Sequence, residues 1–113
     1  MKLEEQVCSL DLAKRLKELG VTQESAFYWM HDPYGDWTLV RRLKDETSDM
    51  PFYSAFSGVE LFDALDRTGV WAEATEEGYR VGSDLSPEFM DLKLADAMAE
   101  LQIHLIEQGI VKP

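Results

Sequence analysis

Residues 26–43, AFYWMHDPYGDWTLVRRL, form the stretch of sequence from which we predict the fold. The run from Phe27 to Met30 is aromatic or apolar, and such residues favour a pleated, half-buried strand. The segment DPYGD that follows is typical of a turn, because proline presets φ and glycine takes up positive φ without steric cost. Residues 37–43 then return as a second strand, so this stretch predicts a β-hairpin.

Alternation along the strands places large apolar groups on both faces of this hairpin. Phe27, Trp29 and His31 share one face, whereas Tyr28 and Met30 share the other. A face left open would show an aromatic patch, which usually marks a binding site. The alternative is that helices cover one face and that a loop or a second copy of the chain, in a homodimer, covers the other.

Amphipathic stretches elsewhere predict three helices. The first spans residues 10–19, where leucines recur at i, i+4 and i+7, with Ser9 as its N-cap. The second spans residues 58–68 behind the capping box SGVE. The last helix begins at Pro87 or near Asp91 and runs to residue 108. A second hairpin is expected between the last two helices, with strands at residues 70–75 and 79–83.

The expected order is therefore helix, hairpin, helix, hairpin, helix (αββαββα), after a short lead-in at residues 1–7. This order predicts a single compact α+β domain over residues 1–113. The economical arrangement is one antiparallel sheet made of both hairpins, with the three helices packed mainly on one face. A chain of 113 residues buries a core without disulfides or metal.

The charge is strongly acidic, with 22 acidic and 11 basic residues and a net charge of −11. Binding to nucleic acid through phosphates needs the opposite sign, so we expect neither direct nucleic-acid binding nor adhesion to an anionic membrane. Residues 51–113 hold twelve of the acids and four of the bases. An acidic surface keeps a small domain soluble. It also complements a basic partner protein.

Five acidic residues of the second half form the candidate surface for such a partner. They are Asp63, Asp66, Glu73, Glu76 and Glu77.

A second candidate site lies on the hairpin, where an arginine joins the aromatic residues. An arginine beside a tryptophan can stack on a flat ligand or hold a phosphate. Trp29, Trp37, Arg41 and His31 are therefore candidates for binding a small anionic ligand such as a nucleotide. The alternative is that the arginines neutralise nearby carboxylates while their stems cover apolar surface.

The sequence offers little support for catalysis. It has no Walker loop, no G-x-G-x-x-G, no G-x-S-x-G and no H-E-x-x-H. His31 beside Asp32 is the one candidate base. We expect no cofactor, no metal site and no catalytic residue. Cys8, the single cysteine, is interpreted as a buried apolar group, which fits a reducing cytoplasm. No run reaches transmembrane length, and the start of the chain lacks the apolar core of a signal peptide.

Three stretches together resemble small uncharacterised proteins encoded by bacteriophages, prophages and other bacterial mobile elements. They are VCSLDLAKRLKELGVTQESAFYW (residues 7–29), YSAFSGVELFDAL (53–65) and LADAMAELQIHLIEQGIVKP (94–113). The resemblance covers about half of the chain. It implies an accessory protein that acts inside a bacterial host, in the cytoplasm, and it carries no catalytic residue.

These observations lead to one functional hypothesis and two alternatives. The hypothesis is a non-enzymatic binding protein, a phage-type accessory or counter-defence factor that blocks a host protein through its acidic surface. The first alternative is a sponge for a small molecule or nucleotide signal, using the aromatic residues and arginine of the hairpin. The second is a small enzyme centred on His31.

Overall fold

The computed structural model describes residues 2–31, 34–41 and 52–113. The described elements are, in order, α1 (Leu3–Gln6), α2 (Leu10–Glu18), β1 (Tyr28–His31), β2 (Trp37–Val40), β3 (Phe52–Ser54), α3 (Gly58–Ala64), the 3₁₀ turn η2 (Asp66–Thr68), β4 (Trp71–Thr75), β5 (Gly78–Ser83), β6 (Ser86–Asp91) and α4 (Leu94–Glu107). The α+β class predicted from the sequence is confirmed.

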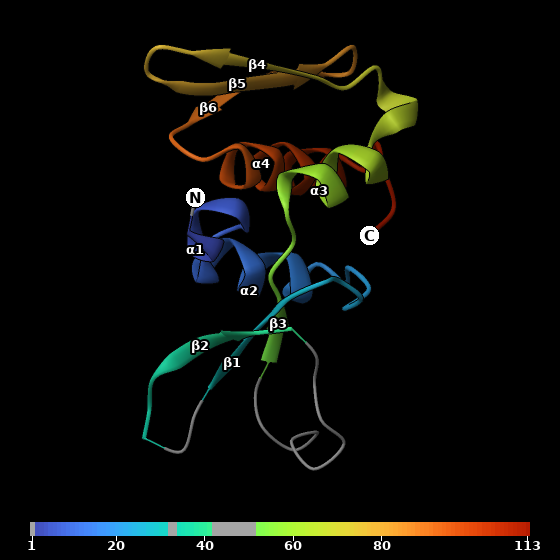
Figure 1. Ribbon diagram of the computed structural model, residues 1–113. Coiled ribbons are helices and arrows are strands. Elements are labelled where there is room, and N and C mark those ends of the chain that lie inside the picture. The colour runs from blue at the N-terminus through green and yellow to red at the C-terminus, as the bar shows by residue number, and fades with distance from the viewer. Residues whose placement is uncertain (1, 32–33, 42–51) are drawn as a thin grey trace.

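The strands form two sheets, each with three antiparallel strands. One has the order β2-β1-β3 and the other the order β4-β5-β6. Figure 1 shows the helices between them: α3 and α4 lie against the β4-β5-β6 sheet, and α1 and α2 lie on the side of the other sheet. The chain is thus layered as sheet, helices, helices, sheet. The prediction of one sheet built from both hairpins is wrong, and the described helices lie on one face of each sheet.

Two strands that the sequence analysis did not predict account for this difference. β3 pairs Tyr53 with Trp29 and so completes the first sheet. β6 occupies residues where the last helix was expected to start, and Phe89 pairs there with Val81. Pro87 lies in this edge strand, at an irregularity of the register, which is a position that tolerates proline. Both hairpins are present, although residues 42 and 43 of the predicted second strand lie outside the described part.

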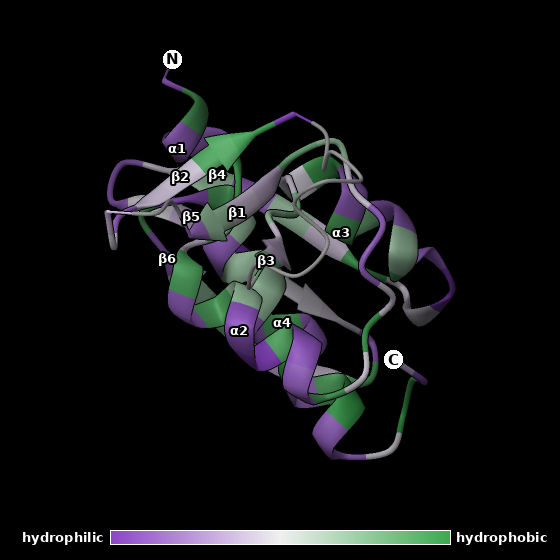
Figure 2. Cartoon of the chain, turned by 90° about the horizontal axis from the view of Figure 1, so that it is seen from below, coloured by the Kyte–Doolittle hydropathy of each residue, from purple (hydrophilic) through white to green (hydrophobic). Residues whose placement is uncertain are grey.

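The two shorter predicted helices are confirmed in their main parts. In α2, Ala13 and Leu16 face the core, and Figure 2 shows bands of hydrophilic and hydrophobic residues along this helix. In α3 the predicted capping box is present: Glu60 N donates to Ser57 Oγ at 3.2 Å, and Ser57 N donates to the Glu60 carboxylate at 3.0 Å.

Two differences concern the beginning of the chain. The predicted lead-in contains the short helix α1, and Val7 and Cys8 behind it are fully buried. Ser9 occupies the N-cap position of α2, yet its side chain makes no capping hydrogen bond. Instead its backbone N–H donates to Asp96 Oδ1 at 2.6 Å, so the start of α2 is tied to the start of α4.

Helix α4 is the centre of the core. Ala97, Met98, Leu101 and Leu105 are fully buried, Leu94 at the start of the helix is half-buried, and several residues on the other sides are buried too. This helix contacts β5 and β6 on one side and α1, α2 and α3 on the others, which explains why it is apolar nearly all round. It joins the second sheet to the rest of the chain.

Candidate functional site

The four residues proposed to bind a small ligand lie on one face of the first sheet, but only two of them meet. His31 pairs with Trp37 across β1 and β2, and their ring centroids are 5.0 Å apart. Arg41 lies at the opposite end of this face, where its guanidinium is 5.8 Å from the ring of Phe27. Arg41 is four residue steps beyond Trp37 along the extended chain, which places their Cα atoms roughly 13 Å apart.

Trp29, between these two ends, is held by the core. Its indole N–H donates to the carbonyl oxygen of Cys8 at 3.0 Å, and the ring packs against the buried cluster. A tryptophan in this position stabilises the contact between the sheet and the start of α2.

His31 and Trp37 instead belong to a small aromatic cluster beneath α2. The ring centroid of Trp37 lies 5.5 Å from that of Tyr53. The ammonium group of Lys14 lies 5.2 Å from the Trp37 centroid and 5.8 Å from the Tyr53 centroid. This is a cation–π arrangement at a half-buried position. It places the ammonium group of Lys14 beside two rings, and that of Lys17 lies 5.1 Å from the Tyr53 centroid.

The five acidic residues proposed to bind a partner fall into two groups. Asp63 is at the end of α3 and Asp66 begins η2, both exposed and ahead of β4. Glu76 and Glu77 form the exposed turn at the other end of β4, and Glu73 lies on that strand. A strand of five residues separates the two groups by roughly 17 Å, so the structure does not gather all five in one patch.

The outer face of the β4-β5-β6 sheet carries a group of charged and aromatic side chains that the sequence analysis did not predict. Figure 1 shows α3 and α4 on one side of this sheet and no described element on the other. Arg80 lies on the open side, 2.7 Å from the Glu73 carboxylate and 3.8 Å from that of Glu88. Its guanidinium is 5.7 Å from the centroid of Trp71, and the indole in turn lies against Gly82.

Strand alternation was the signal that could have revealed this face. Trp71 and Glu73 are two residues apart on β4, and their register partners Gly82 and Arg80 are two apart on β5. Such pairs share one face of a sheet. The hydrogen bond and the charge of Glu73, with the charge of Glu88, hold the pKa of Arg80 above its ordinary value, so the face keeps its central cation.

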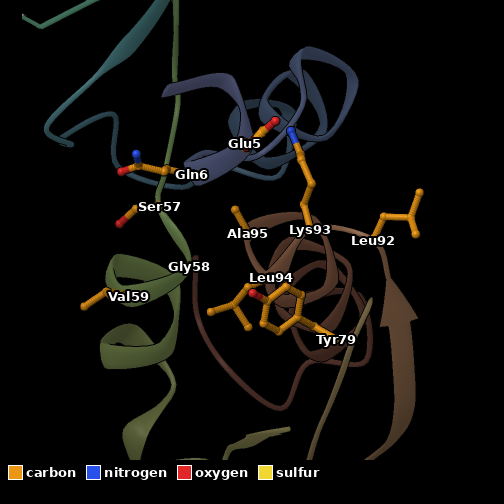
Figure 3. A pocket seen from close by; sticks show the side chains of 10 residues that line it. All are labelled: Glu5, Gln6, Ser57, Gly58, Val59, Tyr79, Leu92, Lys93, Leu94 and Ala95. Atoms are coloured by element: carbon orange, nitrogen blue, oxygen red, sulfur yellow. The ribbon is translucent and has the colours of Figure 1, made fainter. Parts of the chain in front are cut away.

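A pocket of about 510 Å³ opens where the two later helices begin. Figure 3 shows its lining, which comes from α1, from the start of α3, from Tyr79 on β5 and from the start of α4. Val59 and Leu92 on its rim are 67% and 79% exposed, which is unusual for large apolar side chains. The pocket lies near the acidic turn, because Gly78 packs directly against Asp91 and Leu92.

Two further ionisable groups have shifted acidities. Burial raises the pKa of the Cys8 thiol to about 12, so this cysteine is a poor nucleophile, as its interpretation as a buried apolar group implies. Burial and a hydrogen bond to Asp91 raise the pKa of Glu100 to about 7, and the charge of Asp96 adds to the effect. Among the described residues, no three His, Cys, Asp or Glu side chains are grouped so that they could hold a metal ion.

In the described part of the chain, every helix is too short or too polar to cross a bilayer. Comparison of the chain with protein-family models, with curated proteins and with solved structures gives no match. Its function is therefore argued from its own surfaces.

Proposed function

We propose that this chain is a non-enzymatic binding protein, in the manner of a phage-type accessory or counter-defence factor. Its acidic surface would dock on a basic surface of a host protein and block that protein. The observation that carries the proposal is the outer face of the β4-β5-β6 sheet, which no described element covers and on which Arg80 lies beside Trp71. Tryptophan and arginine are the residues most often found at the energetic centre of protein interfaces.

Charge supports a basic partner. The outer face carries Glu73 and Glu88 beside Arg80, and Glu76 and Glu77 extend it at one end. With a net charge of −11, the whole chain attracts a basic protein over long range and accelerates their encounter. The partner's own apolar and aromatic groups would cover Trp71.

The two groups of acidic residues allow a test with matched charge. The double variants Glu76→Lys/Glu77→Lys and Asp63→Lys/Asp66→Lys each raise the net charge by four, at opposite ends of β4. Each variant, tagged, is used to capture host proteins from bacterial lysate, and the captured proteins are identified by mass spectrometry. We expect the first double variant to lose the partner and the second to keep most of it.

Two outcomes would count against this proposal. Equal losses in both double variants would mean that capture depends on net charge and not on this face. Unchanged capture by Trp71→Ala would show that Trp71 does not anchor the partner. Circular dichroism of each variant shows whether it is folded. A homodimer that dissociates in Trp71→Ala, seen by native mass spectrometry, would assign the face to self-association instead.

A second candidate function is binding of a small anionic aromatic molecule, such as a nucleotide signal, at the cluster of Lys14, His31 and Trp37. The ammonium group of Lys14 beside the rings of Trp37 and Tyr53, with His31 against Trp37, favours it. A ligand at a hundred times its dissociation constant adds about 2.7 kcal/mol to the free energy of unfolding. Thermal-shift measurements with nucleotides therefore test this function, and Trp37→Ala should abolish any shift that binding at this cluster causes.

A further inference from the structure

We infer that the pocket at the start of α3 and α4 receives an apolar side chain from a basic segment of the partner protein, a segment with lysine or arginine on both sides of a leucine, methionine or phenylalanine. This inference rests on the proposed function and names the chemistry of the partner.

The apolar walls of the pocket indicate an apolar occupant. Leu94 and Ala95 form part of the lining, and Val59 and Leu92 extend it as exposed apolar rims. Exposed apolar groups beside a hollow mark a surface that another molecule covers. The volume of about 510 Å³ lies within the range of pockets that bury a sizeable apolar group.

The pocket is also preformed. A side chain at Gly58 would meet Leu94 at 2.8 Å, so the absence of a Cβ lets the starts of α3 and α4 approach closely. The capping box of Ser57 and Glu60 fixes the start of α3. An occupant would therefore bind without the cost of ordering the walls.

The charges around the pocket select a basic carrier for that side chain. Among the described residues of the lining, Lys93 is the one cation. It is already occupied, because Nζ donates to the carbonyl oxygen of Glu4 at 2.8 Å and lies 3.7 Å from Asp96. Glu5 on the rim is exposed. Gly78 packs against Leu92, so the exposed turn of Glu76 and Glu77 lies beside the mouth of the pocket, to which Glu5 belongs.

A free anionic small molecule fits this setting poorly, because the acidic mouth repels it and Lys93 is already held. A segment with an apolar side chain between lysines or arginines fits better. Its apolar side chain is stabilised by burial in the pocket, and its flanking cations are attracted by the nearby carboxylates. Met90, 49% exposed on the outer face, lies two residues before Leu92. The pocket and the proposed docking face thus lie on opposite sides of the sheet and approach each other at the end of β6.

The test uses three short synthetic peptides and the full chain. The first has a central leucine between lysines, the second a central serine between lysines, and the third a central leucine between glutamates. Binding is followed by NMR titration of the backbone amides. We expect the first peptide to shift the amides of Val59, Leu92 and Ala95. The second should bind about tenfold more weakly or worse, and the third should not bind.

Variants of the rim provide the second readout. Val59→Asp and Leu92→Asp change exposed residues and should leave the fold intact. Each replaces an apolar contact by a group that is costly to desolvate, and we expect this loss to outweigh the attraction of the new carboxylate to the lysines, so that the first peptide binds about tenfold more weakly. Leu85→Asp, which changes another exposed leucine on the turn between β5 and β6, is the matched control and should have no effect. Equal binding of the leucine and serine peptides would overturn the inference, as would amide shifts confined to the outer face. An alkylammonium ion that binds as tightly as the first peptide would also overturn it, in favour of a small-molecule site.

The same variants separate this inference from the proposed function. If Glu76→Lys/Glu77→Lys loses the host protein while Val59→Asp and Leu92→Asp retain it, the pocket is not the anchor and the proposed function stands. If none of these variants loses it, both proposals fail.

Discussion

Gly82 lies directly beneath the indole of Trp71, so close that a Cβ at this position would be 2.7 Å from the ring carbon Cζ2. The backbone of Gly82 has no positive φ, which means that the close approach of the ring, not the conformation, requires glycine here. The indole thereby packs against the backbone of β5, with the guanidinium of Arg80 5.7 Å from the ring centroid.

Gly82→Ala is expected to tilt the indole of Trp71 away from the sheet. Because the ring edge can move, the loss in the free energy of unfolding should be small, about 1 kcal/mol. The indole N–H resonance of Trp71 should shift in the NMR spectrum, and capture of the partner should weaken. Gly58→Ala is the control, since it should destabilise the contact with Leu94 without moving that resonance. An unchanged Trp71 resonance in Gly82→Ala would contradict the prediction.

Trp29 should behave as a structural residue. Trp29→Ala removes a large ring from the edge of the core and should lower the free energy of unfolding by about 3 kcal/mol. Trp29→Phe keeps most of the packing and loses the hydrogen bond to the Cys8 carbonyl, at a cost of about 1 kcal/mol. Urea denaturation measures both, and Trp37→Ala should cost less than Trp29→Ala. The reverse order would mean that the first sheet is held mainly through Trp37.

Asp96 should contribute to stability by joining two helix starts that are 87 residues apart in sequence. Asp96→Ala leaves the Ser9 N–H without its carboxylate acceptor, and we expect a loss of about 2 kcal/mol in the free energy of unfolding. Asp96→Asn retains an oxygen acceptor, so its free energy of unfolding should lie between that of Asp96→Ala and that of the unchanged chain. Equal stability of all three proteins in guanidinium denaturation would show that this hydrogen bond contributes nothing.

The stability of the protein should fall as the pH rises from about 4.5 to about 7. In this window the folded chain keeps a proton on Glu100, held by burial and by Asp91, whereas the unfolded chain has released it. The folded state therefore binds more protons, and the free energy of unfolding decreases with pH. Below the window both states hold the proton, so this contribution is fully present there.

Glu100→Gln mimics the protonated carboxyl and should flatten the pH dependence in this window, as measured by urea denaturation at several pH values. Glu76→Gln removes one carboxylate from the exposed turn and should preserve the slope. If both variants keep the same slope as the unchanged chain, Glu100 is not the group that titrates.

The helices and hairpins could be predicted from sequence because their signals are local. The SGVE capping box and the leucines of residues 10–19 specify helices by themselves, and aromatic strands around DPYGD specify a hairpin. The third strand of each sheet could not be predicted in this way. Phe52–Ser54 is too short to show alternation. Pro87 lies in β6, but proline is typical of the first turn of a helix, so the sequence predicts a helix there.

The candidate sites depend on pairing, which the sequence does not display. Trp71 and Arg80 come together only when β4 and β5 are placed in register. No local pattern shows that the indole N–H of Trp29 donates to Cys8, a residue 21 positions away. The pocket needs α1, α3, β5 and α4 at once, so no local pattern predicts it.

The position of α4 has a consequence for how the chain opens. This helix contacts β5 and β6 directly, whereas the first sheet packs on α2 through β3. The two sheets are therefore joined in series, and the hairpin of β1 and β2 can come away while the second sheet stays closed on α4. Amide hydrogens of α4 and β5 should exchange with solvent most slowly, and those of β2 much sooner. The surface proposed to capture the partner would thus belong to the last cooperative unit to unfold.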